Sequence, residues 1–238
     1  MRSGSNIFRS SVSNPTDSGE ADVLRGITVL REIREGPHVA KLGERFRFFH
    51  LPSWPGFKAG ALNFALAQAD PAAEVGGVAD ADYVVRRDWL HALVGHFDDP
   101  TVAVVQAPQA HRDWDRQRFR RMMNFEYDGF FRIGMHHRNE RDAIIQHGTM
   151  TLIRAQALRE HGQWAEWTIC EDAELGLRLM KAGLSTVYVD RVMGEGLPPD
   201  DFAAFRKQRR RRSLALAGAL VIGPRIGKFK KDGTSRAF

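Results

Sequence analysis

Val75-Gly76-Gly77-Val78-Ala79-Asp80-Ala81-Asp82 is an apolar run that ends in two carboxylates, and the fold can be inferred outward from it. The run predicts a strand, although Gly76 and Gly77 weaken the prediction because glycine has no side chain to pack. Asp80 and Asp82 are two residues apart, so in extended backbone their side chains point to the same side. Two carboxylates at a strand end can bind one hard cation, Mg²⁺ or Mn²⁺. The competing interpretation is a polar turn, which we favour for an isolated Asp-x-Asp.

The segments on both sides of this run alternate between strand and helix patterns. Further strands are predicted at residues 45–51, 102–105, 143–146, 150–153 and 185–189. Helices are predicted at residues 21–35, 58–69, 89–97, 113–137, 155–161 and 171–182. This alternation predicts an α/β fold with a sheet that carries helices on both faces.

The predicted helix 113–137 is the longest, and a break is expected near Gly129. Its apolar positions recur at helical spacing, which is typical of core packing. These positions are Phe119, Met122, Met123, Phe130 and Phe131.

The segment Thr168-Ile169-Cys170-Glu171-Asp172 has two compatible interpretations. Thr-x-x-Glu is a capping box, in which Thr168 binds the backbone of Glu171 and Glu171 reaches back. Acids in the first turn also favour the helix dipole. A helix start that is capped in this way would hold Asp172 rigidly at the mouth of a cleft.

Basic residues are concentrated in residues 206–212 and again in 228–231, and the net charge is +6 with a pI near 9.8. Such runs can bind phosphate backbones, anionic lipid headgroups or a nucleotide sugar, or can be a solvated helix end. No zinc-finger spacing or aromatic RNA-binding strand accompanies them, so we expect no nucleic-acid partner.

Five motifs in order carry a family resemblance. They are Lys58-Ala59-Gly60-Ala61-Leu62-Asn63, Asp80-Ala81-Asp82, Gln106-Ala107-Pro108, Cys170-Glu171-Asp172 and Gln208 to Arg212. Over residues 41–212 the chain resembles the processive family 2 glycosyltransferases, the cellulose-synthase-like and bacterial β-glucan synthases. The resemblance implies a nucleotide-diphospho-sugar transferase fold of the glycosyltransferase A type, with a mixed sheet and helices on both faces.

The resemblance also implies a role for each matching residue. Because Lys58 and Asn63 match the family's donor-side motif, metal binding by Asp80 and Asp82 is favoured over a simple polar turn. Asp172 would be the general base, and Asp80 and Asp82 would bind Mg²⁺ or Mn²⁺. Donor-binding residues would be Lys58, Asn63, Asp80, Gln208 and Arg211, with arginine suited to a pyrophosphate. Acceptor-binding residues would be His147, Gly148, Thr149 and Glu171.

The chain departs from the family pattern in four places. Cys170 stands where the family commonly has threonine, and Arg212 stands where it has the tryptophan that lies under the acceptor sugar. Residues 1–40 show no strand–turn–strand unit, and no membrane helices follow residue 212. We therefore expect an atypical, partly disordered segment 1–40, a catalytic domain 41–212 with an incomplete N-terminal unit, and a basic tail 213–238. We also expect the chain to be truncated at both ends relative to the family.

Composition sets the remaining limits. A chain of 238 residues with 43% hydrophobic content can bury one substantial core. The single cysteine excludes an internal disulfide, and no apolar run approaches the roughly 20 residues of a membrane span. The chain is expected to be cytoplasmic or peripheral, whereas the family acts at the cytoplasmic side of the inner membrane.

The expected function is that of an inverting glycosyltransferase. It would transfer a sugar, with glucose expected, from a UDP-sugar to a growing β-glucan or related polysaccharide. The alternative is a non-catalytic remnant that binds an anionic membrane surface or a partner through its basic C-terminal segment.

Overall fold

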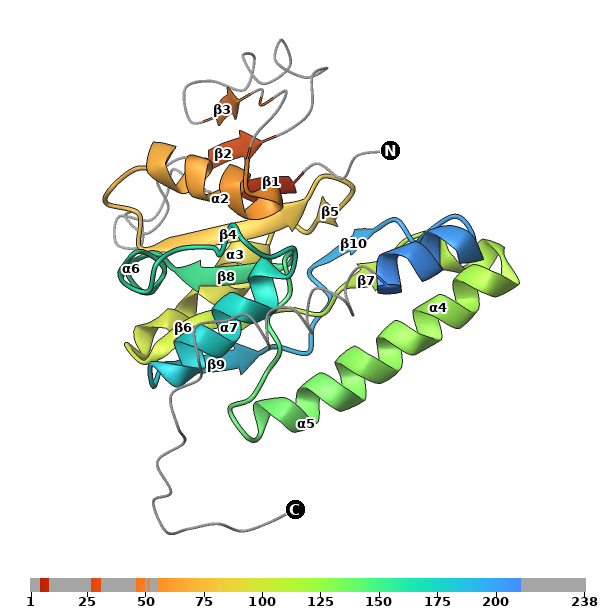
Figure 1. The fold of residues 1–238 in the computed structure, drawn as a ribbon. Helices are drawn as coiled ribbons and strands as arrows, with labels where there is room; N and C mark the ends of the chain where they lie inside the picture. Colours follow the sequence, from red (N-terminus) through yellow and green to blue (C-terminus); the bar gives the residue numbers. More distant parts are fainter. Residues whose placement is uncertain (1–4, 9–26, 31–45, 50, 52–54, 211–238) are drawn as a thin grey trace, which may run out of the picture.

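The main sheet has five strands and mixed direction (Figure 1). The structure is a computed structural model that describes residues 5–8, 27–30, 46–49, 51 and 55–210. The strand order is β1 (Ser5–Phe8), β4 (Val75–Asp80), β8 (Thr151–Arg154), β6 (Val102–Gln106) and β9 (Ser185–Tyr188). The first four strands are antiparallel to their neighbours, and β9 runs parallel to β6. This sheet confirms the predicted strands around residues 75, 102, 150 and 185.

Helices cover both faces of the sheet, as predicted. On one face α2 (Phe57–Gln68), α6 (Ala155–Glu160) and α7 (Glu171–Lys181) share a core cluster that includes Leu62, Leu158 and Leu175. On the other face α3 (Trp89–Val94) and the short 3-10 helix η2 (Gly95–Asp98) bury Trp89, Leu93 and Phe97. Burial of these large side chains from two sides stabilises the sheet as a central layer.

Two smaller sheets complete the strands. One has the order β5 (Val84–Val85), β10 (Gly194–Gly196) and β7 (Ala110–His111). The other pairs β2 (Ile27–Leu30) with β3 (Phe46–Phe49) in parallel. The strand predicted at residues 45–51 is therefore present as β3.

A long helical rod lies to one side of the main sheet (Figure 1). After the short 3-10 helix η3 (Trp114–Arg116) it runs through α4 (Arg118–Asp128), the π-helix η4 (Gly129–Met135) and α5 (His136–Asn139). The predicted break near Gly129 is thus a widening into π geometry. Residues 202–210 are also helical and lie against α4. Within the described part of the chain, no helix is both long and apolar enough to cross a membrane.

Several predictions for the rod and the N-terminal region are wrong. Met123 and Phe131 are buried, but Met122 is 70% exposed, so the apolar stripe is only partly core. A helix was predicted at residues 21–35, but Ile27–Leu30 form strand β2, because pairing with a neighbouring strand overrides a weak local periodicity. The rest of the predicted helix lies outside the described residues. Strands β1 and β2 also lie within residues 1–40, where we expected none, and β1 pairs with β4 in the main sheet.

Residues 143–146 were predicted to be a strand but have no regular secondary structure. Ile144 is fully buried beneath η4, in a cluster with Phe131 and Met135, and Gln146 is also buried. The apolar pattern of this segment therefore reflects packing beneath a helix and not a place in the sheet.

Candidate active site

Four segments meet at Gly148, which lies in the loop before β8. Lys58 Nζ in α2 donates to Asp80 Oδ1 at the end of β4, at 2.6 Å, and to the carbonyl oxygen of Gly148, also at 2.6 Å. A Cβ built on Gly148 would lie 3.1 Å from Asp172 Oδ2, 3.1 Å from Lys58 Nζ and 3.6 Å from Glu171 Oε1. Five of the residues singled out by the sequence therefore surround one point.

The charges at this point are strongly coupled. Burial opposes the charge of Lys58, but attraction to Asp80 and Glu171 outweighs it, so the pKa of Lys58 is raised. Burial, followed by the nearby charge of Asp172, raises the pKa of Glu171 to about 7. Glu171 is only 5% exposed, whereas Asp172 is half-buried. The site thus holds one permanent cation and a carboxyl that titrates near neutral pH.

Gln106 fixes the loop that carries Gly148. Its fully buried side chain donates to the carbonyl oxygens of Ala107, Thr149 and Met150 and accepts from the N–H of His147 at 2.9 Å. Each of these bonds satisfies a backbone group that would be costly to bury unpaired. The loop 147–150 is therefore held by a side chain at the end of the neighbouring strand β6.

Thr149 links the same loop to β4. Its hydroxyl, which is 2% exposed, accepts a hydrogen bond from the backbone N–H of Asp80 at 2.9 Å. Met150 then turns into the left-handed region at φ 54° before β8 begins. The hydroxyl of Thr149 thus positions Asp80, whereas His147 packs against the rings of Phe130 and Phe131.

The start of α7 is built differently from the predicted capping box. The helix begins at Glu171 with Cys170 at the cap position, and the side chain of Cys170 makes no cap hydrogen bond. In the first turn, Asp172 Oδ1 accepts from the N–H of Ala173 at 2.8 Å. Thr168 instead accepts a bond from the N–H of Cys170 at 3.2 Å. The capping-box prediction was wrong because Thr168 lies two residues before the cap position. Glu171 and Asp172 still lie in the first turn, where the helix dipole favours their charge.

Asp82 does not continue the strand. Strand β4 ends at Asp80, Asp82 lies in the following turn, and its Oδ2 accepts from the N–H of Leu197 at 2.9 Å. The argument from strand alternation is therefore wrong for this pair. No group of three or more metal-binding side chains occurs among the residues that the structure describes. The two carboxylates still have the oxygen donors that a hard cation takes, and phosphate oxygens of a ligand would complete its shell.

The other predicted residues lie elsewhere. Asn63 bonds to both backbone groups of Trp164 and to Glu166, so it fixes the loop 164–166 and does not contact the groups around Gly148. Gln208 lies in the helical residues 202–210 beside α4. Arg211, Arg212 and the basic residues 228–231 lie outside the described residues.

Two residues without a predicted role have structural ones: Gln106 supports the site, and Arg209 holds residues 202–210 against α4. In the sequence, Gln106 was recognised only as part of a motif. The feature that could have revealed its role is that it is a polar residue at the end of an otherwise apolar strand. Arg209 bonds to Glu126 at 2.5 Å and lies over the rings of Tyr127 and Phe205. Its basic neighbours in the sequence gave no sign of this contact.

Comparison with known proteins identifies the family of the chain. Residues 78–222, more than half of the chain, match the family described as Glycosyl transferase family group 2. The chain belongs to this family. The predicted resemblance to family 2 glycosyltransferases is therefore confirmed.

Similar proteins include a glucomannan mannosyltransferase and a cellulose synthase subunit. The probable glucomannan 4-beta-mannosyltransferase 14 of Arabidopsis thaliana is 29% identical over 200 residues, which are 81% of this chain and 34% of that protein. The UDP-forming cellulose synthase catalytic subunit of Pseudomonas fluorescens is 31% identical over 183 residues, 74% of this chain and 24% of that protein. The chain thus spans about a third or less of the length of these relatives.

A solved structure supports the fold. The mannosyltransferase PcManGT from Pyrobaculum calidifontis, in complex with GDP-Man and Mn²⁺, superposes with a TM-score of 0.56 at 19% identity. The match covers 85% of this chain and 56% of that chain. The mixed α/β fold of the glycosyltransferase A type is confirmed.

Proposed function

We propose that this glycosyltransferase domain is an inverting hexosyltransferase that extends a β-linked polysaccharide from a nucleotide-diphospho-sugar, with UDP-glucose as the expected donor. The observation that supports the proposal best is the convergence of Asp172, Lys58 and Asp80 on Gly148. The carboxylate of Asp172 and the ammonium of Lys58 both lie 3.1 Å from a Cβ placed on Gly148, so a candidate base and a candidate phosphate ligand share one small site.

Asp172 would act as the general base. Its Oδ atoms would take the proton of the acceptor hydroxyl while that oxygen forms a bond to the anomeric carbon. The bond between the anomeric carbon and the diphosphate oxygen breaks, and its electron pair leaves with the nucleoside diphosphate. Attack from the face opposite the leaving group inverts the configuration at the anomeric carbon.

Lys58 would act on the donor side. Its ammonium group is fixed by two bonds of 2.6 Å, so it needs little reorganisation to offset charge that develops on the departing diphosphate. Asp80 and Asp82 would hold Mg²⁺ or Mn²⁺, which when bound supplies Lewis-acid stabilisation of the diphosphate. Gln208 and Arg211 remain predicted donor-binding residues, and His147, Gly148 and Thr149 remain predicted neighbours of the acceptor.

The buried carboxyl of Glu171 would contribute to the acceptor side. Its position between Lys58 and Asp172 lets it accept or donate a hydrogen bond to an acceptor hydroxyl, depending on protonation. In this arrangement Asp172 and not Glu171 is the base, because Asp172 is the less buried of the two and faces Gly148.

Donor turnover with and without metal tests the proposal. The chain is given UDP-glucose or GDP-mannose with Mn²⁺ or with a chelator, and release of the nucleoside diphosphate is measured. We expect turnover of one donor that requires the metal and that Asp82→Asn reduces strongly. Asp115→Asn, which removes an exposed carboxylate in η3, is the matched control. Equal turnover in the chelator would contradict the metal role, and no turnover of any nucleotide sugar would contradict the enzyme assignment.

A further inference from the structure

A pocket of about 420 Å³ lies between α2 and α7, and the mechanism above does not use it. Its wall includes Asn63, Trp164, Glu166, Trp167, Glu174 and Arg178. This volume is within the range of sites that hold small molecules. The pocket combines an aromatic surface with carboxylates, and these side chains limit the kinds of ligand that it can bind.

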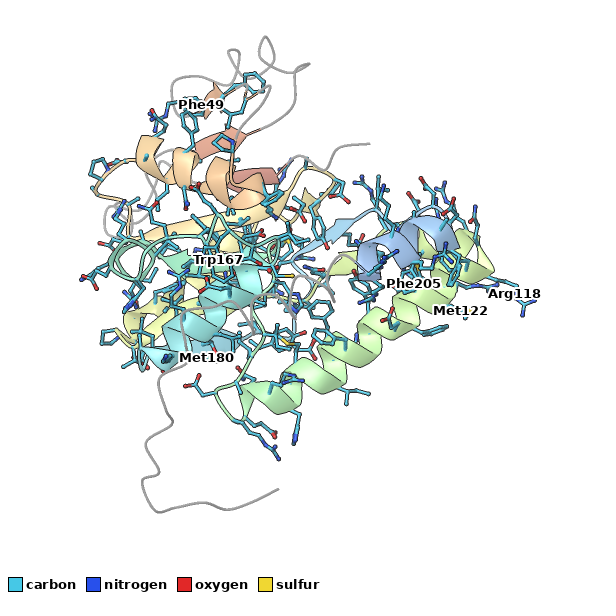
Figure 2. The ribbon with its side chains drawn as sticks, in the orientation of Figure 1. Phe49, Arg118, Met122, Trp167, Met180 and Phe205 are labelled. Carbon is cyan, nitrogen blue, oxygen red and sulfur yellow. The ribbon has the colours of Figure 1, made fainter. Side chains whose placement is uncertain are left out.

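Trp167 is the aromatic surface, and Figure 2 shows it beside α7. Its side chain is 50% exposed, although tryptophan is among the residues that are most buried on average. Nearby residues of the same loop are buried, since Trp164, Ala165 and Thr168 are 5%, 8% and 6% exposed. The indole is thus presented to solvent by a loop that is anchored by these buried residues.

The loop that carries Trp167 is fixed by side-chain bonds. Asn63 binds the N–H and the carbonyl of Trp164, at 3.0 and 2.9 Å, and Glu166 Oε1 at 2.8 Å. Gly56 leaves room for Glu166, since a Cβ there would lie 2.6 Å from Glu166 Oε2. A site built in this way loses little conformational entropy when a ligand binds.

The opposite wall of the pocket, formed by Glu174 and Arg178 of α7, is also fixed, and it does not favour the binding of an anion. Arg178 forms an ion pair with Glu174 at 2.6 Å and donates to the carbonyls of Gln163 and His161. The guanidinium of Arg178 already binds these groups of the protein, and the carboxylates of Glu166 and Glu174 would repel a phosphate. A neutral, hydroxyl-rich ligand with one apolar face fits this wall, because hydroxyls donate to carboxylates and the apolar face stacks on indole.

We propose that Trp167 and Glu166 form a saccharide subsite, in which the indole stacks on a pyranose ring of the acceptor chain and the Glu166 carboxylate accepts hydrogen bonds from its hydroxyls. Trp167 and Asp172 are five positions apart in the sequence, so their Cα atoms lie within about 18 Å of each other. An acceptor that ends at Asp172 can therefore reach the pocket within a few sugar residues. This inference rests on the proposed function.

The test measures the binding of defined oligosaccharides by calorimetry, with cellohexaose and mannohexaose as probes. We expect one of them to bind, Trp167→Ala to weaken that binding about tenfold, and Trp167→Phe to weaken it less. Glu166→Gln should weaken it by a smaller factor. Phe125→Ala, which removes a 66% exposed ring from α4, is the matched control and should leave it unchanged. Because Trp167 is half-exposed, its truncation removes little core, and melting curves verify folding.

Nucleotide binding is measured on the same variants, to separate this inference from the proposed function. Nucleoside diphosphate with Mn²⁺ should bind equally to the unmodified chain and to Trp167→Ala. If nucleotide binds and neither oligosaccharide does, the subsite is refuted while the proposed function stands. If Trp167→Ala weakens nucleotide and not oligosaccharide, the indole stacks on the base and the proposal is wrong. If nothing binds, both proposals fail.

Discussion

The carboxylates around Gly148 differ in burial, and in the proposed mechanism the less buried one, Asp172, acts as the base. Glu171 is 5% exposed and its pKa is raised to about 7, whereas Asp172 is half-buried and faces the same point from the first turn of α7. Lys58 offsets part of this negative charge at 2.6 Å from Asp80. Two adjacent acids in one helix turn can thus take different roles.

Asp172→Asn should abolish sugar transfer and leave nucleotide binding within a few-fold, because a base acts chiefly in the transition state. Transfer is measured by incorporation of labelled sugar, and binding by calorimetry with nucleoside diphosphate and Mn²⁺. Asp115→Asn should behave like the unmodified chain. Retained transfer in Asp172→Asn would remove this residue from the base role.

Glu171→Gln should change how stability depends on pH. The pKa of Glu171 is raised from 4.5 to about 7, so the folded chain holds a proton that the unfolded chain releases. This stabilising contribution is fully present below about pH 4.5 and is lost as pH rises to about 7, a change of at most about 3 kcal/mol. The variant should lack that decline when urea unfolding is followed from about pH 5 to about pH 8.

Glu195→Gln, at an exposed position in β10, is the control and should keep the pH dependence of the unmodified chain. An unchanged decline in Glu171→Gln would show that another group is responsible.

At the scale of elements, the site is assembled where β4, β6 and β8 lie side by side. Gln106 at the end of β6 bonds to residues 147, 149 and 150, and Thr149 bonds to Asp80 at the end of β4. These bonds connect the C-terminal ends of β6 and β4 to the loop that precedes β8. The position of Gly148 therefore depends on strand pairing and not on the loop sequence alone.

Gln106→Ala should destabilise the fold by about 2–3 kcal/mol, because it leaves several buried backbone groups unpaired. The free energy of unfolding in urea measures this change. Gln156→Ala, which removes an exposed glutamine in α6, should cost less than about 0.5 kcal/mol. A similar small loss for both variants would mean that the loop does not depend on Gln106.

At the scale of the whole molecule, the chain folds as a central sheet with a helical rod beside it, and residues 202–210 close against that rod (Figure 1). Arg209 connects the two helices through Glu126 and two aromatic rings, and Arg120 bonds to Asp200 at 2.8 Å. Gln208, a predicted donor-binding residue, is carried by this helix. Its placement depends on the contact with α4.

Arg209→Ala should loosen residues 202–210 without unfolding the sheet. Hydrogen exchange should rise in these residues by about tenfold, since an ion pair and cation–π contacts together are worth on the order of 1–2 kcal/mol. Exchange in β6 and α7 should not change. Arg210→Ala, at an exposed neighbouring position, is the control. Equal protection in both variants would show that Arg209 does not hold the helix.

The sequence by itself determined the class of fold, the family and the order of the motifs, because apolar periodicity and short polar signatures are local properties. The strand before Asp80 and the helix that starts at Glu171 follow from such patterns. Tertiary structure decided the rest. Lys58 meets Gly148 across 90 positions, and β1 reaches β4 from a segment that was expected to hold no strand. Contacts between distant segments depend on the packing of the whole sheet, and no local pattern encodes which backbone carbonyl a buried lysine or glutamine will meet.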